Sequence, residues 1–121
     1  MNDAVLLCRL DALPEQGARG FDPLGHGTDT VFVVRKGQML RAYLNRCPHY
    51  GDTPLPWRKD QYLDAAGDAI VCAAHGARFN PATGLCVLGP CLGQSLTAVP
   101  LELNTNGELT AAVTSLQETT P

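Results

Sequence analysis

Apolar residues in this chain fall in short runs that are separated by Gly, Pro, Asn and Asp. Short apolar runs with such boundaries predict β-strands rather than helices. The runs expected to form strands are residues 4–10, 30–35, 38–45, 69–72, 77–79, 85–88, 95–103 and 108–113. In the last run Leu109, Ala111 and Val113 alternate with other residues, which is the period of a half-buried strand. The pattern therefore predicts an all-β protein.

The segments between these runs carry turn-forming residues. Lys36-Gly37 predicts a hairpin between residues 30–35 and 38–45, and residues 104–107 predict another between the last two strands. Asn80-Pro81-Ala82-Thr83-Gly84 has strong turn chemistry. Residues 11–15 predict a turn or one helical turn, and the glycine-rich stretch that follows, through Gly27, predicts a loop.

Composition narrows the class of protein. The chain has 121 residues, of which 45% are hydrophobic and 17% charged, as expected for a single globular domain. The net charge of −3 and the absence of a basic patch argue against nucleic acid as a partner. No apolar run approaches the length of a membrane span, and the first residues, with Asp3, do not resemble a signal peptide. We therefore expect a cytoplasmic protein.

Cysteine and histidine are concentrated in the middle of the chain. Residues 46–92 hold four of the five Cys and two of the three His. An odd number of Cys without a secretory signal favours metal binding over disulfides. We therefore expect a metal-binding subdomain at about residues 46–92, inserted into a base subdomain of residues 1–45 and 93–116.

Two short motifs provide the expected ligands. Cys47-Pro48-His49 and Cys72-Ala73-Ala74-His75 each follow a predicted strand, and a glycine follows each of them. Two such turns facing one another would direct two thiolates and two imidazoles to one point. A Cys₂His₂ set also binds zinc in structural sites, so the motifs alone leave zinc open.

The paired motifs resemble those of the Rieske iron–sulfur family, and the resemblance covers nearly the whole chain. It extends to Asn45-Arg46, Thr53-Pro54-Leu55, Ile70-Val71, residues 79–84 and Gly89-Pro90. The resemblance implies three small antiparallel sheets and one [2Fe–2S] cluster. In this family two Cys bind one iron and two His bind the other. Carried over, Cys47 and Cys72 would bind the inner iron, and His49 and His75 the outer iron.

Other positions suggest the low-potential ferredoxin branch of this family. High-potential members carry two further cysteines in the ligand loops, where this chain has Asp52 and Ala74. They also carry a Ser and a Tyr after the second His ligand, where this chain has Ala77 and Phe79. Without these hydroxyl donors we expect a potential at the low end of the family range.

The resemblance implies a one-electron carrier that is not an enzyme by itself. We expect a monomer that takes electrons from a flavin-dependent reductase and passes them to a terminal oxygenase or another redox enzyme. The contact would be formed by the exposed edges of His49 and His75, with Pro90 and Leu92 nearby. Two alternatives stay open, a small subunit of a nitrite-reductase-like complex and a zinc-stabilised structural module.

Three further features lie outside the ligand motifs: the pair Cys86 and Cys91, the spacer between the motifs, and Cys8. Cys86 and Cys91 flank Gly89-Pro90, and they are either a local disulfide or two thiols. The spacer between the motifs is longer than in most relatives, with the extra length in a loop at residues 57–67. Cys8 lies in an apolar run and is expected to be a small buried side chain.

Overall fold

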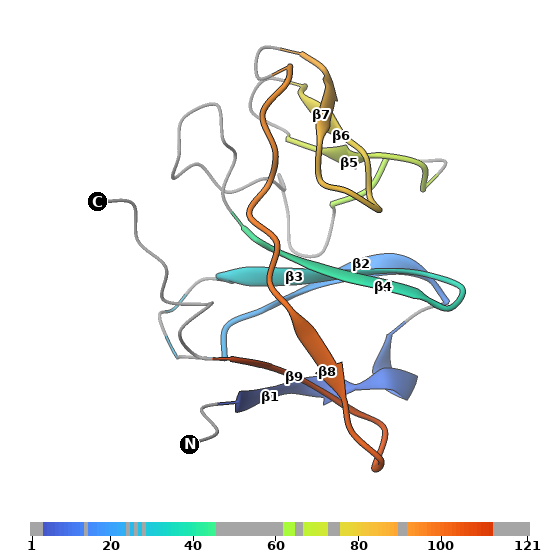
Figure 1. The fold of residues 1–121 in the computed structure, drawn as a ribbon, viewed down its shortest axis with the longest axis vertical. Coiled ribbons are helices and arrows are strands. Elements are labelled where there is room, and N and C mark those ends of the chain that lie inside the picture. Colours follow the sequence, from blue (N-terminus) through green and yellow to red (C-terminus); the bar gives the residue numbers. More distant parts are fainter. Residues whose placement is uncertain are drawn as a thin grey trace.

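The computed structural model describes residues 4–13, 15–23, 25, 27, 29–45, 62–64, 67–72, 76–89 and 92–112. These residues form three antiparallel sheets of three strands each, with strand orders β1-β9-β8, β2-β3-β4 and β5-β6-β7. Figure 1 shows the sheets stacked in three layers, with β2-β3-β4 in the middle and β5-β6-β7 uppermost. The expected all-β fold of three small antiparallel sheets is confirmed.

The strands are short, and a single turn of 3-10 helix, η1, follows the first of them. No helix among the described residues is long and apolar enough to cross a membrane. The elements are β1 (Ala4–Arg9), η1 (Leu10–Ala12), β2 (Gln16–Phe21), β3 (Val31–Lys36), β4 (Met39–Leu44), β5 (Ile70–Val71), β6 (Arg78–Phe79), β7 (Cys86–Leu88), β8 (Leu101–Leu103) and β9 (Glu108–Ala112).

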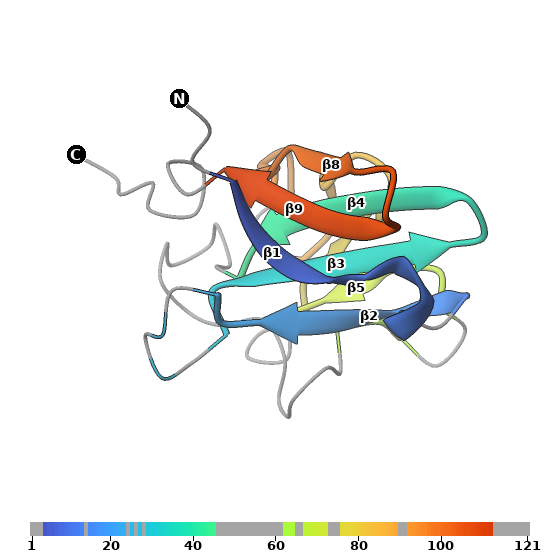
Figure 2. The same ribbon diagram turned by 90° about the horizontal axis from the view of Figure 1, so that it is seen from below.

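The middle sheet is buried on both faces. All four residues from Val31 to Val34 are fully buried, which explains why β3 is a continuous apolar run rather than an alternating one. Phe32, Val34 and Tyr43 belong to an upper core shared with β5-β6-β7. The opposite face of this sheet belongs to a lower core shared with β1-β9-β8. Figure 2, seen from below, shows the lowest sheet crossing over the middle one.

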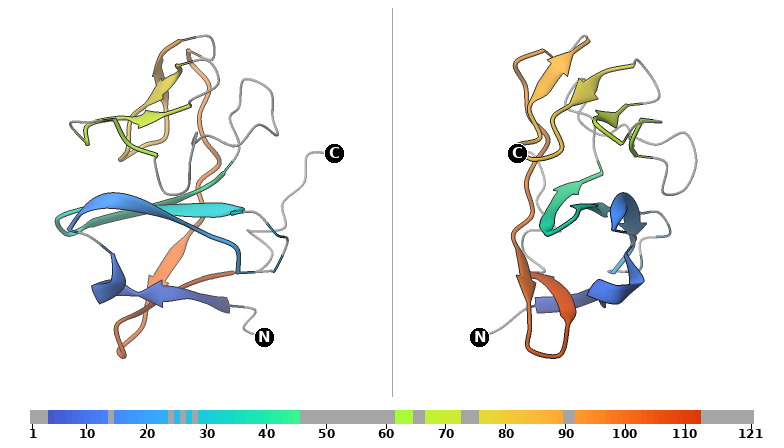
Figure 3. Two further views of the ribbon diagram at one scale, coloured as in Figure 1. Left: turned by 180° about the vertical axis from the view of Figure 1, so that it is seen from behind. Right: turned by 90° about the vertical axis from the view of Figure 1, so that its right-hand side faces the viewer.

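The segment from Gln94 to Leu101 connects all three layers. Gln94 O accepts a hydrogen bond from Cys86 N at 2.7 Å, which ties the segment to β7. Further along, Leu44 N donates to Thr97 O and Val99 N donates to Ala42 O, which ties it to β4. Beyond Pro100 the chain enters β8 in the lowest sheet. Figure 3 shows this orange segment running along one side of the layers. The chain therefore passes from the upper sheet to the lowest one through a segment bonded to each layer.

Two of the sequence expectations need correction. Residues 16–21, expected to be loop, form β2, because each of them pairs with a residue of β3 despite the two glycines. Residues 95–100, expected to begin a long strand, form only isolated bridges at Ser95 and Ala98, because they pass from one sheet to another. The other expected strands and both hairpins are present, with bounds that differ by one or two residues.

Candidate metal centre

Cys72 is the one expected ligand that the structure describes. Cys47, His49 and His75 lie outside the described residues. Among the described residues, no three His, Cys, Asp or Glu side chains lie close enough to share a metal ion. The ligand set as a whole therefore stays a prediction from the sequence, and the described surroundings of Cys72 test whether the site suits the expected cluster.

Two hydrogen bonds close the loop from Cys72 to Ala77, the second of the two expected ligand loops. Cys72 directly follows β5, and its N–H donates to Ala77 O at 2.9 Å. Gly76 N donates to Cys72 O at 2.8 Å. Gly76 has a φ of 73°, in the left-handed region that glycine adopts without steric cost. Cys72, Gly76 and Ala77 are thus bonded to one another where the chain passes from β5 to β6.

The thiol of Cys72 lies in the upper core. Cys72 is fully buried, together with Ala77 and Phe79, and Cys86 belongs to the same core. A thiolate in such apolar surroundings is costly unless a metal neutralises it, which suits an iron ligand. The described part of the site therefore fits a buried cluster whose inner iron is bound by cysteine.

A second segment packs directly against this loop. Gly89 has a φ of 110°, and a Cβ placed on it would lie 2.8 Å from Ala77 Cα. Only glycine allows the backbone after β7 to approach the ligand loop so closely. Leu92 N then donates to Gly89 O at 3.2 Å and closes the turn. This is the segment that the resemblance identifies as the proline loop covering the cluster, although Pro90 itself lies outside the described residues.

Three cysteines lie outside the expected ligand set. Cys86 is buried, and its thiol donates to Leu88 O at 3.4 Å. Cys91 lies outside the described residues, so a disulfide between these two cysteines stays untested. Cys8 is partly buried and packs against the lower core, and burial raises the pKa of its thiol.

An aspartate that the sequence reasoning did not identify organises the approach to the second ligand loop. Asp64 Oδ1 accepts a hydrogen bond from Asp68 N at 2.9 Å, and Asp64 N donates to Ala69 O at the same distance. Its other carboxylate oxygen forms an ion pair with Arg78 on β6. The hydrogen bond from Asp68 N to the carboxylate, with smaller contributions from the N–H groups of Ala69 and Gly67 and from Arg78, holds the pKa of Asp64 below its usual range. Part of the expected loop 57–67 is therefore the start of a short hairpin, with Leu63 bridged to Ile70.

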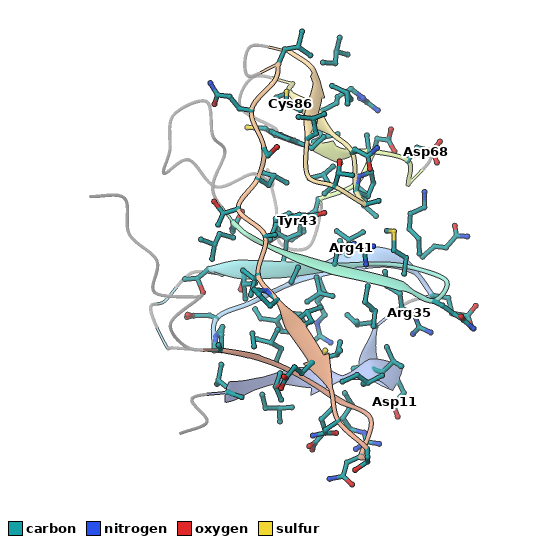
Figure 4. The ribbon with its side chains drawn as sticks, viewed as in Figure 1. Asp11, Arg35, Arg41, Tyr43, Asp68 and Cys86 are labelled. Carbon is teal, nitrogen blue, oxygen red and sulfur yellow. The ribbon has the colours of Figure 1, made fainter. Side chains whose placement is uncertain are left out.

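Contacts from the middle sheet support two turns of the upper layer, the one at residues 80–84 and the one that contains Asp68. Tyr43 Oη donates to Pro81 O at 2.8 Å, and Arg41 Nε donates to Ala82 O at 3.1 Å. Lys36 at the end of β3 lies 3.6 Å from the carboxylate of Asp68. Figure 4 shows Tyr43 and Arg41 at the boundary between the middle and upper layers, with Asp68 at the side of the upper layer. The upper sheet is thus held at several points on the sheet beneath it.

The chain is similar to several known proteins over most of its length. The family model described as "Rieske [2Fe-2S] domain" matches residues 3–112. No curated protein matches this chain. Among solved structures, it is 28% identical to the ferredoxin of carbazole 1,9a-dioxygenase from Nocardioides aromaticivorans IC177, covering 92% of this chain and 98% of that one with a TM-score of 0.69.

Two further solved structures are similar to this chain. One is a complex of reduced oxygenase and oxidized ferredoxin in carbazole 1,9a-dioxygenase. Its matched chain is 27% identical to this chain, and the match covers 93% of this chain and 94% of that one with a TM-score of 0.70. The other is the Sphingomonas yanoikuyae B1 ferredoxin, at 22% identity, with 89% and 96% of the chains covered and a TM-score of 0.67. The family model matches nearly the whole chain and describes an iron–sulfur domain, so it favours an iron–sulfur site over the zinc-stabilised module. This chain belongs to the Rieske [2Fe–2S] domain family.

Proposed function

We propose that this protein is a Rieske-type ferredoxin, a one-electron carrier between a flavin-dependent reductase and a terminal oxygenase. The observation that carries the proposal is its similarity to the ferredoxin of a dioxygenase over nearly the full length of both chains. This similarity favours the oxygenase system over the nitrite-reductase-like alternative. The protein is a cytoplasmic monomer in this proposal and turns over no substrate by itself.

In the proposal Cys47 and Cys72 bind one iron, and His49 and His75 bind the other. A bound [2Fe–2S] cluster supplies the one-electron chemistry. The protein keeps the Cys72 side of the site dry within the upper core and closes the second ligand loop with its two hydrogen bonds. Dry, fixed surroundings limit the reorganisation that accompanies a change in charge.

An exposed apolar patch provides a surface where a redox partner can dock. The patch consists of Leu85, Val87, Leu88 and Leu92, which are between 42% and 67% exposed and lie just before β7, on β7 and in the turn that follows it. It adjoins Gly89, which contacts the loop of Cys72. Exposed apolar residues grouped beside a functional loop mark an interaction site. The expected contact at Leu92 thus extends along β7.

The docking patch lies in a stretch of sequence without charges, because residues 79–101 contain no Asp, Glu, Lys, Arg or His. The charged residue opposite Leu88 across the β6-β7 pair is Arg78, which is ion-paired with Asp64. Electrostatic steering raises the association rate of charged interfaces, and added salt lowers that rate again. The association rate of apolar contacts does not depend on salt in this way. We therefore expect the oxygenase to offer an uncharged apolar surface here, and we expect association to depend weakly on ionic strength.

The function is tested by electron transfer to an oxygenase component. The protein is titrated with dithionite under anaerobic conditions and then mixed in a stopped-flow instrument with the oxidised oxygenase of carbazole 1,9a-dioxygenase. We expect uptake of one electron per chain and its transfer to the oxygenase, with a rate that changes less than about threefold between about 50 and 500 mM salt. Two-electron uptake, or no transfer to the oxygenase, would contradict the proposed function.

The docking patch has a matched control within the same chain. Leu88→Lys places a charge in the patch, and Leu6→Lys places one at a leucine of similar exposure on β1, in the sheet farthest from β7. We expect Leu88→Lys to weaken transfer by about tenfold, as a central interface residue does, and Leu6→Lys to leave it unchanged. Equal effects of the two variants would place the docking surface elsewhere.

A further inference from the structure

The segment 46–61 carries Cys47 and His49, and its two flanking residues, Asn45 and Tyr62, are both described. A ligand segment can hold a cluster in a defined geometry only if its ends are fixed. The surroundings of these two residues therefore show what the base contributes to the first ligand pair.

Asn45 is fixed by two hydrogen bonds to the chain before β3. It directly follows β4, and it is the one buried polar or charged residue among those described. Its backbone N–H donates to Thr30 O at 2.9 Å, and its side-chain Nδ2 donates to Asp29 O at 3.0 Å. Buried polar side chains with satisfied hydrogen bonds specify a single arrangement of the backbone around them. The chain thus leaves the middle sheet in a fixed direction, two residues before Cys47.

Tyr62 is fixed at the other end of the segment. The residue is fully buried, and its ring stacks on Phe32 of β3 with the centroids 4.1 Å apart and the planes at 10°. Its backbone carbonyl accepts a hydrogen bond from Val71 N at 2.8 Å, immediately before Cys72. Tyr62 therefore joins the end of the first ligand segment to the strand that leads to the second ligand loop.

The two ends of the segment are linked through Asp29, beside Gly20 of β2. A Cβ placed on Gly20 would lie 2.5 Å from Asp29 Oδ2 and closer still to Tyr62 Oη. The carboxylate of Asp29 and the hydroxyl of Tyr62 thus converge above the bare Cα of Gly20. Asp29 also accepts the hydrogen bond from the side chain of Asn45 through its backbone carbonyl. Asn45 is therefore hydrogen-bonded to Asp29, and Tyr62 lies against Gly20 beside the carboxylate of the same Asp29, so both flanking residues of segment 46–61 are packed around Asp29.

We propose that Asp29, Asn45 and Tyr62 are positioning residues for the cluster, with Gly20 leaving the space in which Asp29 and Tyr62 meet. They act through the backbone of the first ligand segment and set the relative placement of the two ligand pairs. This inference rests on the proposed assignment of Cys47 and His49 as ligands. Partners of metal ligands outside the coordination sphere commonly alter metal retention by about tenfold or more.

The test compares three variants with a matched control. Gly20→Ala introduces a methyl group between Asp29 and Tyr62, Asn45→Ala removes the hydrogen bond to Asp29, and Tyr62→Phe removes the hydroxyl but keeps the ring. Asn104→Ala is the control, because Asn104 Oδ1 accepts hydrogen bonds from Asn106 and Glu108 in the turn between β8 and β9. The readouts are the EPR g-values of the reduced protein, the rate of iron loss to a chelator and the Tm.

We expect Gly20→Ala and Asn45→Ala to shift the g-values and to speed iron loss by about tenfold. Asn104→Ala should lower the Tm without changing either cluster property. Because Tyr62→Phe removes one of the atoms that the new methyl group would meet, it should partly restore iron retention when combined with Gly20→Ala. Tyr62→Phe alone, which keeps the stacked ring, should fold and still shift the g-values.

Unchanged g-values and iron retention in Asn45→Ala and Tyr62→Phe would overturn the inference, whatever the Tm. If Tyr62→Phe does not restore iron retention when combined with Gly20→Ala, Tyr62 does not act together with Gly20 and Asp29. Failure of the proposed ligand set is a different result, because the wild-type protein itself would then lack the EPR signal of a cluster with mixed Cys and His ligands.

Discussion

Ala77 and Phe79 show how single residues around the second ligand loop bear on the reduction potential. Both are fully buried beside Cys72, and neither side chain has a hydrogen-bond donor. Hydrogen bonds to the sulfur atoms of a cluster stabilise the reduced state and raise its potential. We therefore expect this cluster to have a potential at the low end of the family range of about −150 to +300 mV.

Replacing Ala77 with serine should raise the potential. The new hydroxyl lies two residues after His75, at the position where high-potential relatives carry a donor. A hydrogen bond to a charged group is worth about 1.5 kcal/mol, which for one electron corresponds to about 60 mV. A redox titration followed by visible absorption measures the shift. Ala82→Ser, in an exposed turn, is the control and should leave the potential unchanged. An equal reduction potential in Ala77→Ser and wild type would contradict the claim that the missing hydroxyl lowers the potential.

The elements show where sequence patterns succeed and where they do not. β3 begins with the apolar run Val31–Val34, and β4 is apolar except for Arg41, so with Lys36-Gly37 between them their hairpin is predicted by local sequence alone. β2 contains Gly17 and Gly20 and has no apolar alternation, and it is a strand only because it pairs with β3. The pattern around Gly20 cannot reveal that Tyr62 and Asp29 need the space, because these residues are distant in sequence. Pairing with β3 thus makes a strand of residues whose own strand propensity is too weak to predict one.

Asp64 gives the hairpin before β5 a pH dependence. Its folded pKa lies below the ordinary value of about 3.9, mainly because Asp68 N donates to the carboxylate, with Arg78 also contributing. A lowered folded pKa contributes stability that is present above the unfolded pKa and is lost as the pH falls through the folded pKa. Asp64→Asn should therefore have a lower Tm than wild type at neutral pH, and the difference should shrink below about pH 4.

Asp68→Asn is the matched control for this prediction. Asp68 lies in the same turn, and its side chain is 76% exposed beside Lys36. Exposed ion pairs contribute little, so this variant should differ from wild type only slightly at any pH. Thermal melts of the three proteins from pH 7 to pH 3 make the comparison. A Tm difference between Asp64→Asn and wild type that stays constant with pH would contradict the role of the carboxylate.

At the scale of the whole molecule, the sequence predicts the class of fold, which is confirmed, and a set of four ligands, which stays a prediction; it does not predict the stacking of the layers. The Cys and His motifs are local and strongly patterned, so they identify the family from the sequence. The segment from Gln94 to Leu101 bonds to all three layers, and its short bridges have no local signature. The upper core is shared between the insert and the middle sheet. The division into a base and a cluster-binding subdomain therefore stays a proposal.

Removal of iron tests that division. Metal ligation contributes folding free energy to the part of the protein that holds the metal. In the iron-free protein, the amides of β5 and β6 should exchange with deuterium about tenfold faster or more, whereas those of β3 and β9 should change little. Hydrogen exchange followed by mass spectrometry on the protein with and without iron measures this. Uniform acceleration in all three sheets would show one cooperative unit instead of two subdomains.

The central claim is that Cys47, His49, Cys72 and His75 hold one [2Fe–2S] cluster. The most direct test is an EPR spectrum of the dithionite-reduced protein, with iron and acid-labile sulfide assayed on the same sample. We predict a rhombic signal with the low average g-value of mixed Cys and His ligation, two irons and two sulfides per chain, and loss or alteration of the signal in Cys72→Ser and His75→Cys. A sample without this signal, or an unchanged spectrum in either variant, would contradict the assignment.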